Sequence, residues 1–198
     1  MAFSALNDLV RLLSSLPGIG SRSALRITFH LIKSDEYMVK QLSEALLNLK
    51  RNIRFCRRCG GLSESEICDI CSDKSRNPEI LCIVEEPQDI LSIEKTGEYN
   101  GRYHVLMGAI SPLDGIGPDD LRINELREII ESEKISEIFI ATNPTLEGDA
   151  TASYISEILP DENIALTRIT HGLQTGGSIE FADRSTLARS IRNRQKIR

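Results

Sequence analysis

Apolar residues recur at helical spacing through the first third of the chain. Residues 4–16 place Leu and Val three or four positions apart, and Ser4 stands where it can cap this helix. The segment Leu16-Pro17-Gly18-Ile19-Gly20 interrupts the pattern, and a second helix is predicted from about Ser21 to Ile32. Asp35 is positioned to cap a third helix, whose apolar face consists of Met38, Leu42, Ala45, Leu46 and Leu49. The pattern therefore predicts a helical region over residues 1–54.

The pattern changes after Glu79, where short β-type runs alternate with helical stretches. The runs lie at 80–84, 102–106, 137–141 and 164–169, and the helical stretches at about 88–95, 119–133 and 146–159. Such alternation predicts βαβ units with a parallel sheet, here over residues 77–172. Asp183 is placed to cap a last helix, running to about Arg194, in a C-terminal extension over residues 173–198. The fold class predicted for the chain is thus a multi-module α/β protein.

Four of the five cysteines lie in residues 55–76, a stretch with too few large apolar side chains for a core of its own. They form two pairs, Cys56-x-x-Cys59 and Cys68-x-x-Cys71, and each pair places two thiolates on one tight turn. Four sulfurs match the tetrahedral preference of Zn²⁺ and leave no position for water, so such a zinc is structural. The alternatives are disulfides, which a cytosolic location disfavours, chance, and an iron–sulfur cluster.

Charge is distributed unevenly along the chain, although the net charge of −5 by itself argues against a nucleic-acid partner. Residues 1–60 hold ten Lys and Arg against four Asp and Glu, and residues 189–198 hold five basic residues and no acid. Residues 61–188 hold nine basic and 25 acidic residues. A basic front end on an acidic body can bind phosphates while the body stays soluble, but solvation of surface helices explains the same charges equally well.

The N-terminus lacks the basic region of a signal peptide, and no apolar run reaches the roughly 18 residues of a membrane span. We therefore expect a cytoplasmic protein, associated with the nucleoid if it binds DNA.

The segment Leu16–Gly20, followed by Ala24, fits the helix-hairpin-helix pattern. The bare backbone of Gly18 and Gly20 allows N–H groups to approach a phosphate at the start of the next helix. Arg22 and Arg26 are four residues apart and share a helix face, from which they can hold successive phosphates without reading bases. We predict sequence-independent DNA binding here, with an ordinary helix turn and two surface arginines as the alternative.

Acidic residues follow two of the predicted strands. Glu85 and Glu86 end the first strand, and residues 141–150 (ATNPTLEGDA) follow a later one, so both loops belong to the carboxyl edge of the sheet. This resembles the toprim domain, in which Glu85 matches the first carboxylate and Glu147-Gly148-Asp149 match an acidic turn.

The two aspartates of the toprim D-x-D pair are replaced here by Asn143 and Thr145. Mg²⁺ for phosphoryl transfer is usually held by carboxylates, and an amide or hydroxyl is a weak substitute. No phosphate-binding Walker A loop occurs either. We therefore expect no catalytic residue and no enzyme, and keep a metal-dependent toprim nuclease or topoisomerase as the alternative.

Taken in order, LPGIG, the paired CxxC motifs, VEEP, residues 95–121, 141–152 and 171–183 resemble the RecR family of bacterial recombination mediators over essentially the whole chain. Arg22 departs from the Lys expected at that position of the hairpin, which keeps the charge but changes its geometry.

The resemblance implies a helix-hairpin-helix region, a four-cysteine zinc finger over residues 55–76 and a toprim domain, assembled into a ring-like homotetramer that can encircle DNA. It implies binding to single- and double-stranded DNA, RecO as a partner, RecF in some bacteria, and loading of RecA onto gapped DNA. We hypothesise that the toprim carboxylates, Glu85, Glu86, Glu147 and Asp149, now form a surface for docking a basic partner.

Overall fold

The computed structural model describes residues 3–159, 164–170, 173, 176 and 178–192. The chain divides into two compact units, Met1–Ile53 and Arg54–Arg198, which are described separately below.

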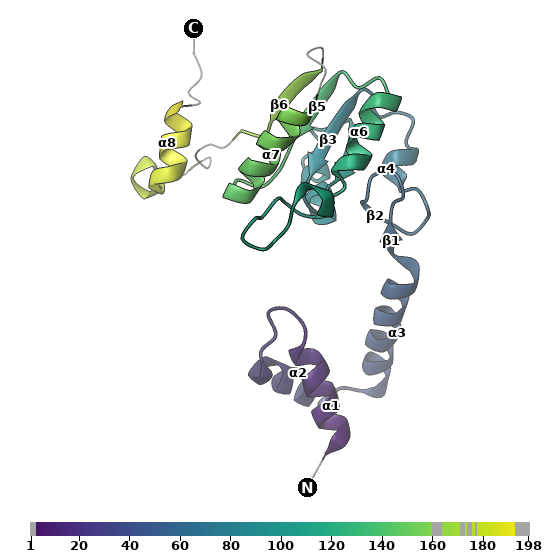
Figure 1. The fold of residues 1–198 in the computed structure, drawn as a ribbon. Helices are drawn as coiled ribbons and strands as arrows, with labels where there is room; N and C mark the ends of the chain where they lie inside the picture. The colour runs from purple at the N-terminus through teal and green to yellow at the C-terminus, as the bar shows by residue number, and fades with distance from the viewer. Residues whose placement is uncertain (1–2, 160–163, 171–172, 174–175, 177, 193–198) are drawn as a thin grey trace. The chain divides into compact units, whose positions relative to one another are not determined.

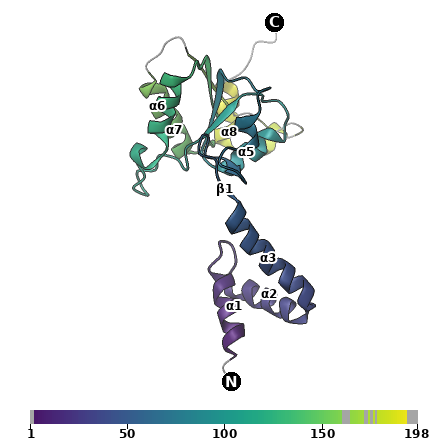
Figure 2. The same cartoon turned by 90° about the vertical axis from the view of Figure 1, so that its right-hand side faces the viewer.

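The first unit consists of three helices, as the sequence predicts: α1 (Ser4–Ser14), α2 (Ser21–Lys33) and α3 (Glu36–Asn52) (Figure 2). The carboxylate of Asp35 accepts a hydrogen bond of 2.7 Å from the backbone N–H of Met38, which confirms it as the cap of α3. The expectation that Ser4 caps α1 is wrong. Ser4 is the first helical residue, Phe3 occupies the capping position, and no side chain caps this end.

Helices α1 and α2 pack on each other, but the first unit has almost no core. Only Ala24 and Thr28 of α2 are buried, whereas α1 and α3 bury no residue. Large apolar side chains remain exposed on all three helices, among them Leu12, Leu25, Phe29, Ile32, Leu42, Leu46 and Leu49. The first unit by itself therefore leaves the apolar faces of its amphipathic helices uncovered.

The second unit is built on a parallel sheet of strand order β4-β3-β5-β6, which confirms the predicted α/β class (Figure 1). Its strands are β3 (Ile80–Val84), β4 (Arg102–Val105), β5 (Glu137–Ile140) and β6 (Ala165–Arg168). Its helices are α5 (Pro87–Glu94), α6 (Ile123–Ser132) and α7 (Leu146–Ile158). Helix α6 starts later than predicted, because Pro118–Asp120 form a separate 3₁₀ turn, η1.

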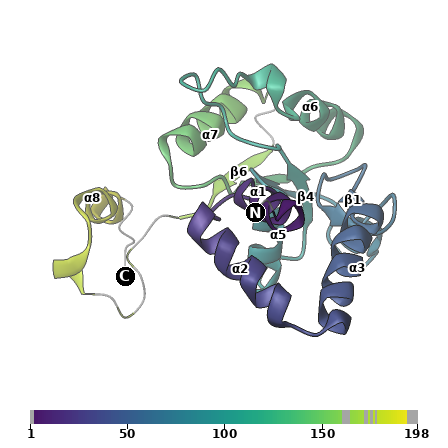
Figure 3. The ribbon, with the colours of Figure 1, turned by 90° about the horizontal axis from the view of Figure 1, so that it is seen from below.

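The side chains of β3 alternate between two cores on opposite faces of the sheet. Leu81 and Ile83 belong to the core that α6 and α7 cover, and Cys82 and Val84 to the core that contains Ile90 of α5 and the four cysteines. Figure 3 shows α6 and α7 on one side of the strands and α5 on the other. Both faces of the central strand are thus buried, as its continuous apolar sequence requires.

The cysteine-rich segment packs against the sheet domain and shares its second core. It contains β1 (Arg54–Phe55), which pairs antiparallel with β2 (Leu62–Ser63), and the short helix α4 (Asp69–Ser72). The carbonyl of Cys59 accepts a hydrogen bond of 2.8 Å from the N–H of Val105, at the end of β4. Arg58 forms an ion pair of 2.5 Å with Glu133. The sheet domain therefore supplies the core that residues 55–76 lack.

The C-terminal region contains the 3₁₀ turn η2 (Ile179–Phe181) and the helix α8 (Arg184–Arg192). Asp183 accepts a hydrogen bond of 2.9 Å from the N–H of Thr186, which confirms it as the cap of α8. The predicted helix end at Arg194 and most of the basic tail, residues 193–198, lie outside the described residues. Within the described part of the chain, no helix combines the length and apolarity needed to cross a membrane.

Candidate functional sites

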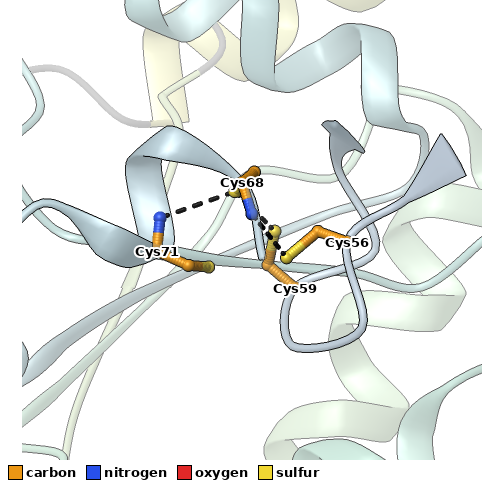
Figure 4. A group of neighbouring side chains, drawn as sticks. All are labelled: Cys56, Cys59, Cys68 and Cys71. Carbon is orange, nitrogen blue, oxygen red and sulfur yellow. Dashed lines mark hydrogen bonds between the residues drawn. The ribbon is translucent and has the colours of Figure 1, made fainter. Parts of the chain in front are cut away.

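The four clustered cysteines converge on one buried point (Figure 4). Their sulfurs all lie within 4.8 Å of one another, and the Sγ atoms of Cys59 and Cys68 are 3.6 Å apart. Four thiolates at about 2.3 Å from a tetrahedral zinc would be about 3.8 Å from each other. The spacing of the sulfurs therefore fits a zinc ion, and burial of all four residues leaves no place for a reacting water.

Backbone N–H groups are directed at the sulfurs. Cys56 Sγ accepts from the N–H of Cys68 at 3.3 Å, Cys68 Sγ from that of Cys71 at 3.4 Å, and Cys59 Sγ from that of Gly61 at 3.3 Å. The hydrogen bond between the thiols of Cys59 and Cys68 raises the pKa of Cys59 and lowers that of Cys68. Metal-free sulfurs must therefore share protons, whereas a divalent cation stabilises all four as thiolates.

The turn of the first cysteine pair depends on glycine. Gly60 has a positive φ of 79°, and a Cβ there would collide with the guanidinium of Arg122 and lie 3.1 Å from the side chains of Met107 and Val105. Gly60 thus allows the turn and its close approach to β4.

The helix hairpin presents its predicted residues to solvent. Gly18 adopts a positive φ of 77°, and Gly20 is the N-cap of α2, where no side chain caps the first turn. A Cβ on either glycine would meet nothing within 4 Å, so the backbone here is open to a ligand. Arg22 and Arg26 are both exposed, and neither forms an ion pair within the described chain. These features suit an anion at the N-terminus of α2.

The two acidic loops converge at the carboxyl edge of the sheet, where Glu85 and Asn143 form a double hydrogen bond. The backbone N–H of Asn143 donates to Oε1 of Glu85 at 2.8 Å, and its side-chain amide donates to Oε2 at 2.5 Å. Glu85 is only 7% exposed. Both oxygens of this buried carboxylate are therefore occupied by one neutral residue, in the position where the toprim motif has a second acid.

The loop after β5 is held in a shape that brings Asn143 to Glu85. Thr142 Oγ1 donates to the carbonyl of Gly148 at 2.9 Å, and Thr145 Oγ1 caps α7 by accepting from the N–H of Gly148 at 3.0 Å. A Cβ at Gly148 would collide with the carbonyl oxygen of Asn143 and lie 2.8 Å from Glu85 Oε1. Glycine is thus required at this position by close packing.

Asp149 also forms an ion pair within the chain. Its Oδ1 accepts a charge-assisted hydrogen bond of 2.6 Å from Arg168, at the end of β6. Sequence reasoning missed Arg168 and the role of Asn143, although both follow strands that end at the same edge. Glu86 is the N-cap residue of α5 and Glu147 lies in the first turn of α7, both partly exposed. A basic partner would reach Glu86 and Glu147 more readily than Glu85.

Comparison with family models matches four segments of the chain. Residues 6–50 match the helix-hairpin-helix of RecR, residues 53–73 its four-cysteine zinc finger domain, residues 79–170 a toprim domain and residues 175–195 the RecR C-terminal region. With the sulfur geometry above, the second match identifies the cysteine cluster as a structural zinc site.

Three relatives, each named Recombination protein RecR, are similar to the chain over nearly its full length. The protein of Acidothermus cellulolyticus is 49% identical over 192 residues, covering 97% of this chain and 96% of the relative. That of Syntrophobacter fumaroxidans is 47% identical over 96% and 94% of the two chains. That of Streptomyces coelicolor is 45% identical over 97% and 96%.

Proposed function

Because the chain belongs to the RecR family, we propose that it is a DNA-binding mediator of recombination and repair rather than an enzyme. In this proposal it forms a ring-like tetrameric clamp and acts with RecO, and with RecF where present, to load RecA onto gapped or single-stranded DNA. Its domains are residues 1–54, 55–76, 77–172 and 173–198, and it works in the cytoplasm at the nucleoid.

The observation that carries the proposal is the open N-terminus of α2. The backbone around Gly18 and Gly20 is unobstructed, no acidic residue lies in the first turn, and Arg22 and Arg26 extend from it into solvent. Backbone N–H groups and two guanidinium groups together bind phosphates without reading bases. DNA binding should therefore be independent of sequence and weaken as salt rises.

The test is the double variant Arg22→Ala, Arg26→Ala. Losing two phosphate contacts should lower the slope of log affinity against log salt by about 1.8 on duplex DNA. The matched control is Arg127→Ala, Lys134→Ala, which removes the same charge from exposed positions of the second unit. Fluorescence anisotropy with a labelled duplex measures both slopes. Equal slopes for the two double variants would show that the hairpin is only structural.

Assembly into an oligomer is supported by the uncovered helices of the first unit. Helix α3 buries none of its 17 residues, yet Leu42, Leu46 and Leu49 lie on one face of it. A helix gains most of its stability by burying such a face, so we propose that a second copy covers it. Sedimentation of Leu46→Glu, Leu49→Glu should show a smaller species than the wild-type chain, whereas an unchanged mass would place the interface elsewhere.

The proposed docking of RecO at the toprim carboxylates is supported by the partly exposed Glu86 and Glu147. The variant Glu86→Ala, Glu147→Ala should weaken RecO binding. The control Glu128→Ala, Glu157→Ala, which removes two exposed acids from α6 and α7, should not. Equal RecO affinity of both variants would exclude this surface.

The absence of catalysis is supported by the bond between Asn143 and Glu85, which occupies the carboxylate that a toprim metal would need. A nicking assay with Mg²⁺ or Mn²⁺ tests this directly, since cleavage by the purified chain would instead establish the nuclease or topoisomerase alternative.

A further inference from the structure

The cysteine-rich segment, residues 55–76, carries an exposed aromatic side chain next to several arginines. Within the second unit, Arg54, Arg57 and Arg58 occur with no acidic residue before Glu64. Phe55 stands in the middle of this stretch and is 60% exposed. An aromatic ring held in water costs free energy, so its position on a rigid module calls for a ligand that covers it.

The backbone at Phe55 is fixed by strand pairing and by the cysteine that follows it. It lies in β1 directly opposite Leu62 of β2, which is itself 47% exposed, so the two side chains form one apolar platform. The next residue, Cys56, is a buried zinc ligand, and its N–H donates to the carbonyl of Gly61 at 2.7 Å. The platform therefore stays in place when it meets a ligand.

Two exposed arginines lie one and two residues from Phe55 in the sequence. Arg54 is exposed and forms no ion pair within the described residues. Arg57 pairs with Glu66 at 2.8 Å, but both side chains are mostly exposed, at 79% and 66%, and such a surface pair contributes little. Both guanidinium groups are therefore available to phosphates.

The charge around Phe55 distinguishes it from Phe181, the other strongly exposed aromatic residue among those described in the second unit. Phe181 lies between Glu180 and Asp183, which repel a polyanion, whereas Phe55 lies between Arg54 and Arg57. A flat ring with an arginine close to it on either side in the sequence is complementary to a nucleobase and its phosphates.

We propose that the β1–β2 hairpin is a base-stacking site for single-stranded nucleic acid, with Phe55 stacking on an unpaired base and Arg54 and Arg57 contacting the adjoining phosphates. This deepens the proposed function, on which it rests, and uses residues separate from the helix hairpin. Stacking requires a base that is free on one face, so the site favours single strands over duplex. The helix hairpin, which holds phosphates only, has no such preference.

The experiment compares zinc-loaded, full-length Phe55→Ala, Phe55→Trp and the control Phe181→Ala on oligo(dT) and on a duplex of equal length. A stacked base contributes about 1–3 kcal/mol, so Phe55→Ala should weaken binding of the single strand by roughly 5- to 100-fold. Binding of the duplex should change less than about twofold, and Phe181→Ala should leave both affinities unchanged. Zinc content confirms that each variant keeps the metal.

The chain has no Trp, so Phe55→Trp introduces a single fluorescent reporter at the site. Its emission should be quenched by oligo(dT) but not by duplex, and its affinity for the single strand should equal that of wild type. Equal loss on both DNAs in Phe55→Ala, or an unquenched Trp in a complex with oligo(dT), overturns the proposal. So does a change in oligomer mass with both affinities intact, because the platform is then an interface between copies.

Failure of the helix-hairpin proposal is recognised separately. In that case Arg22→Ala, Arg26→Ala leaves duplex binding unchanged, while loss of single-strand binding in Phe55→Ala still supports the stacking site.

Discussion

The bond between Asn143 and Glu85 predicts what happens when the missing toprim acid is restored. Asn143→Asp replaces a donor 2.5 Å from Glu85 Oε2 with a second carboxylate. The change removes a hydrogen bond to a charged group, which contributes about 1.5–3 kcal/mol. Two like charges about 4 Å apart also repel by about 4 kcal/mol at an effective dielectric constant near 20.

Side chains rotate and a proton can bind between the acids, so the two contributions do not add fully. We expect Asn143→Asp to lower the free energy of unfolding by about 4 kcal/mol at neutral pH. A chain of this length then melts about 10 °C lower. The loss should shrink in acid, because protonation of either carboxylate removes the repulsion.

A divalent cation should rescue the same variant. Glu85 and the new Asp supply carboxylate oxygens, the donors that Mg²⁺ and Mn²⁺ prefer, and a ligand that binds only the folded state raises its stability. Millimolar Mn²⁺ should therefore raise the melting temperature of Asn143→Asp and leave that of wild type unchanged.

Thr145→Asp is the matched control for this variant. It adds the same charge two residues away, at the N-cap of α7, where Asp is also a good cap and complements the helix dipole. Its stability should equal that of wild type. If Asn143→Asp has the same melting temperature as wild type in the absence of metal, the amide of Asn143 does not stabilise the Glu85 carboxylate in place of a cation, and the reasoning fails.

Three further predictions concern packing, metal and pH. Gly148→Ala should destabilise by about 2–4 kcal/mol in chemical denaturation through overpacking, whereas Gly117→Ala, whose Cβ would meet only an atom at 3.7 Å, should be tolerated. Metal analysis should find about one zinc ion per chain in wild type and none in Cys68→Ser. The same variant should increase the hydrogen exchange of the Val105 amide, which donates to the carbonyl of Cys59; retained zinc would contradict the site. Burial lowers the pKa of His104 to about 4, so wild type should lose about 3 kcal/mol as pH falls from about 6.5 to 4. A His104→Leu variant should lack this loss in acid melts.

The sign of the pH effect follows from the difference in the pKa of His104 between the folded and unfolded states. The unfolded chain protonates this residue below its ordinary pKa of about 6.5, whereas the folded chain keeps it neutral down to about 4. Between these values the unfolded state binds more protons, and stability therefore rises with pH.

The sequence predicts local features of the fold well, because their causes are local. The alternation of apolar runs is sufficient for the four strands, and Asp35 and Asp183 cap their helices as expected. Ser4 fails as a cap because α1 begins one residue earlier than the side chain suggests. Capping depends on the backbone angles of a single residue, which periodicity does not fix.

Contacts between segments that are distant in the sequence could not be predicted from it. Asn143 and Glu85 are 58 positions apart and meet only because β3 and β5 are neighbours in a parallel sheet. The pattern of strands predicted that both residues lie at the carboxyl edge of the sheet. It could not show that the amide of Asn143 would donate a hydrogen bond to the carboxylate of Glu85. The ion pair between Arg58 and Glu133 could not be predicted either, because it depends on how the cysteine-rich segment packs on the sheet.

The zinc site and the acidic site both contain buried groups that are negatively charged when ionised, but different partners stabilise that charge in the two sites. Four buried sulfurs within 4.8 Å of one another have other sulfurs and backbone N–H groups as hydrogen-bond partners and no cationic side chain among these partners, so they need a cation to become thiolates together. The buried carboxylate of Glu85 meets two N–H donors of Asn143, and Asp149 meets Arg168, so each acid has a donor already. A metal would have to displace these bonds before it gained any of its own. The cysteine-rich segment therefore depends on a metal and the acidic site does not, because only the acids have side-chain N–H donors of their own. Asn143→Asp removes such a donor from Glu85 by changing a single residue.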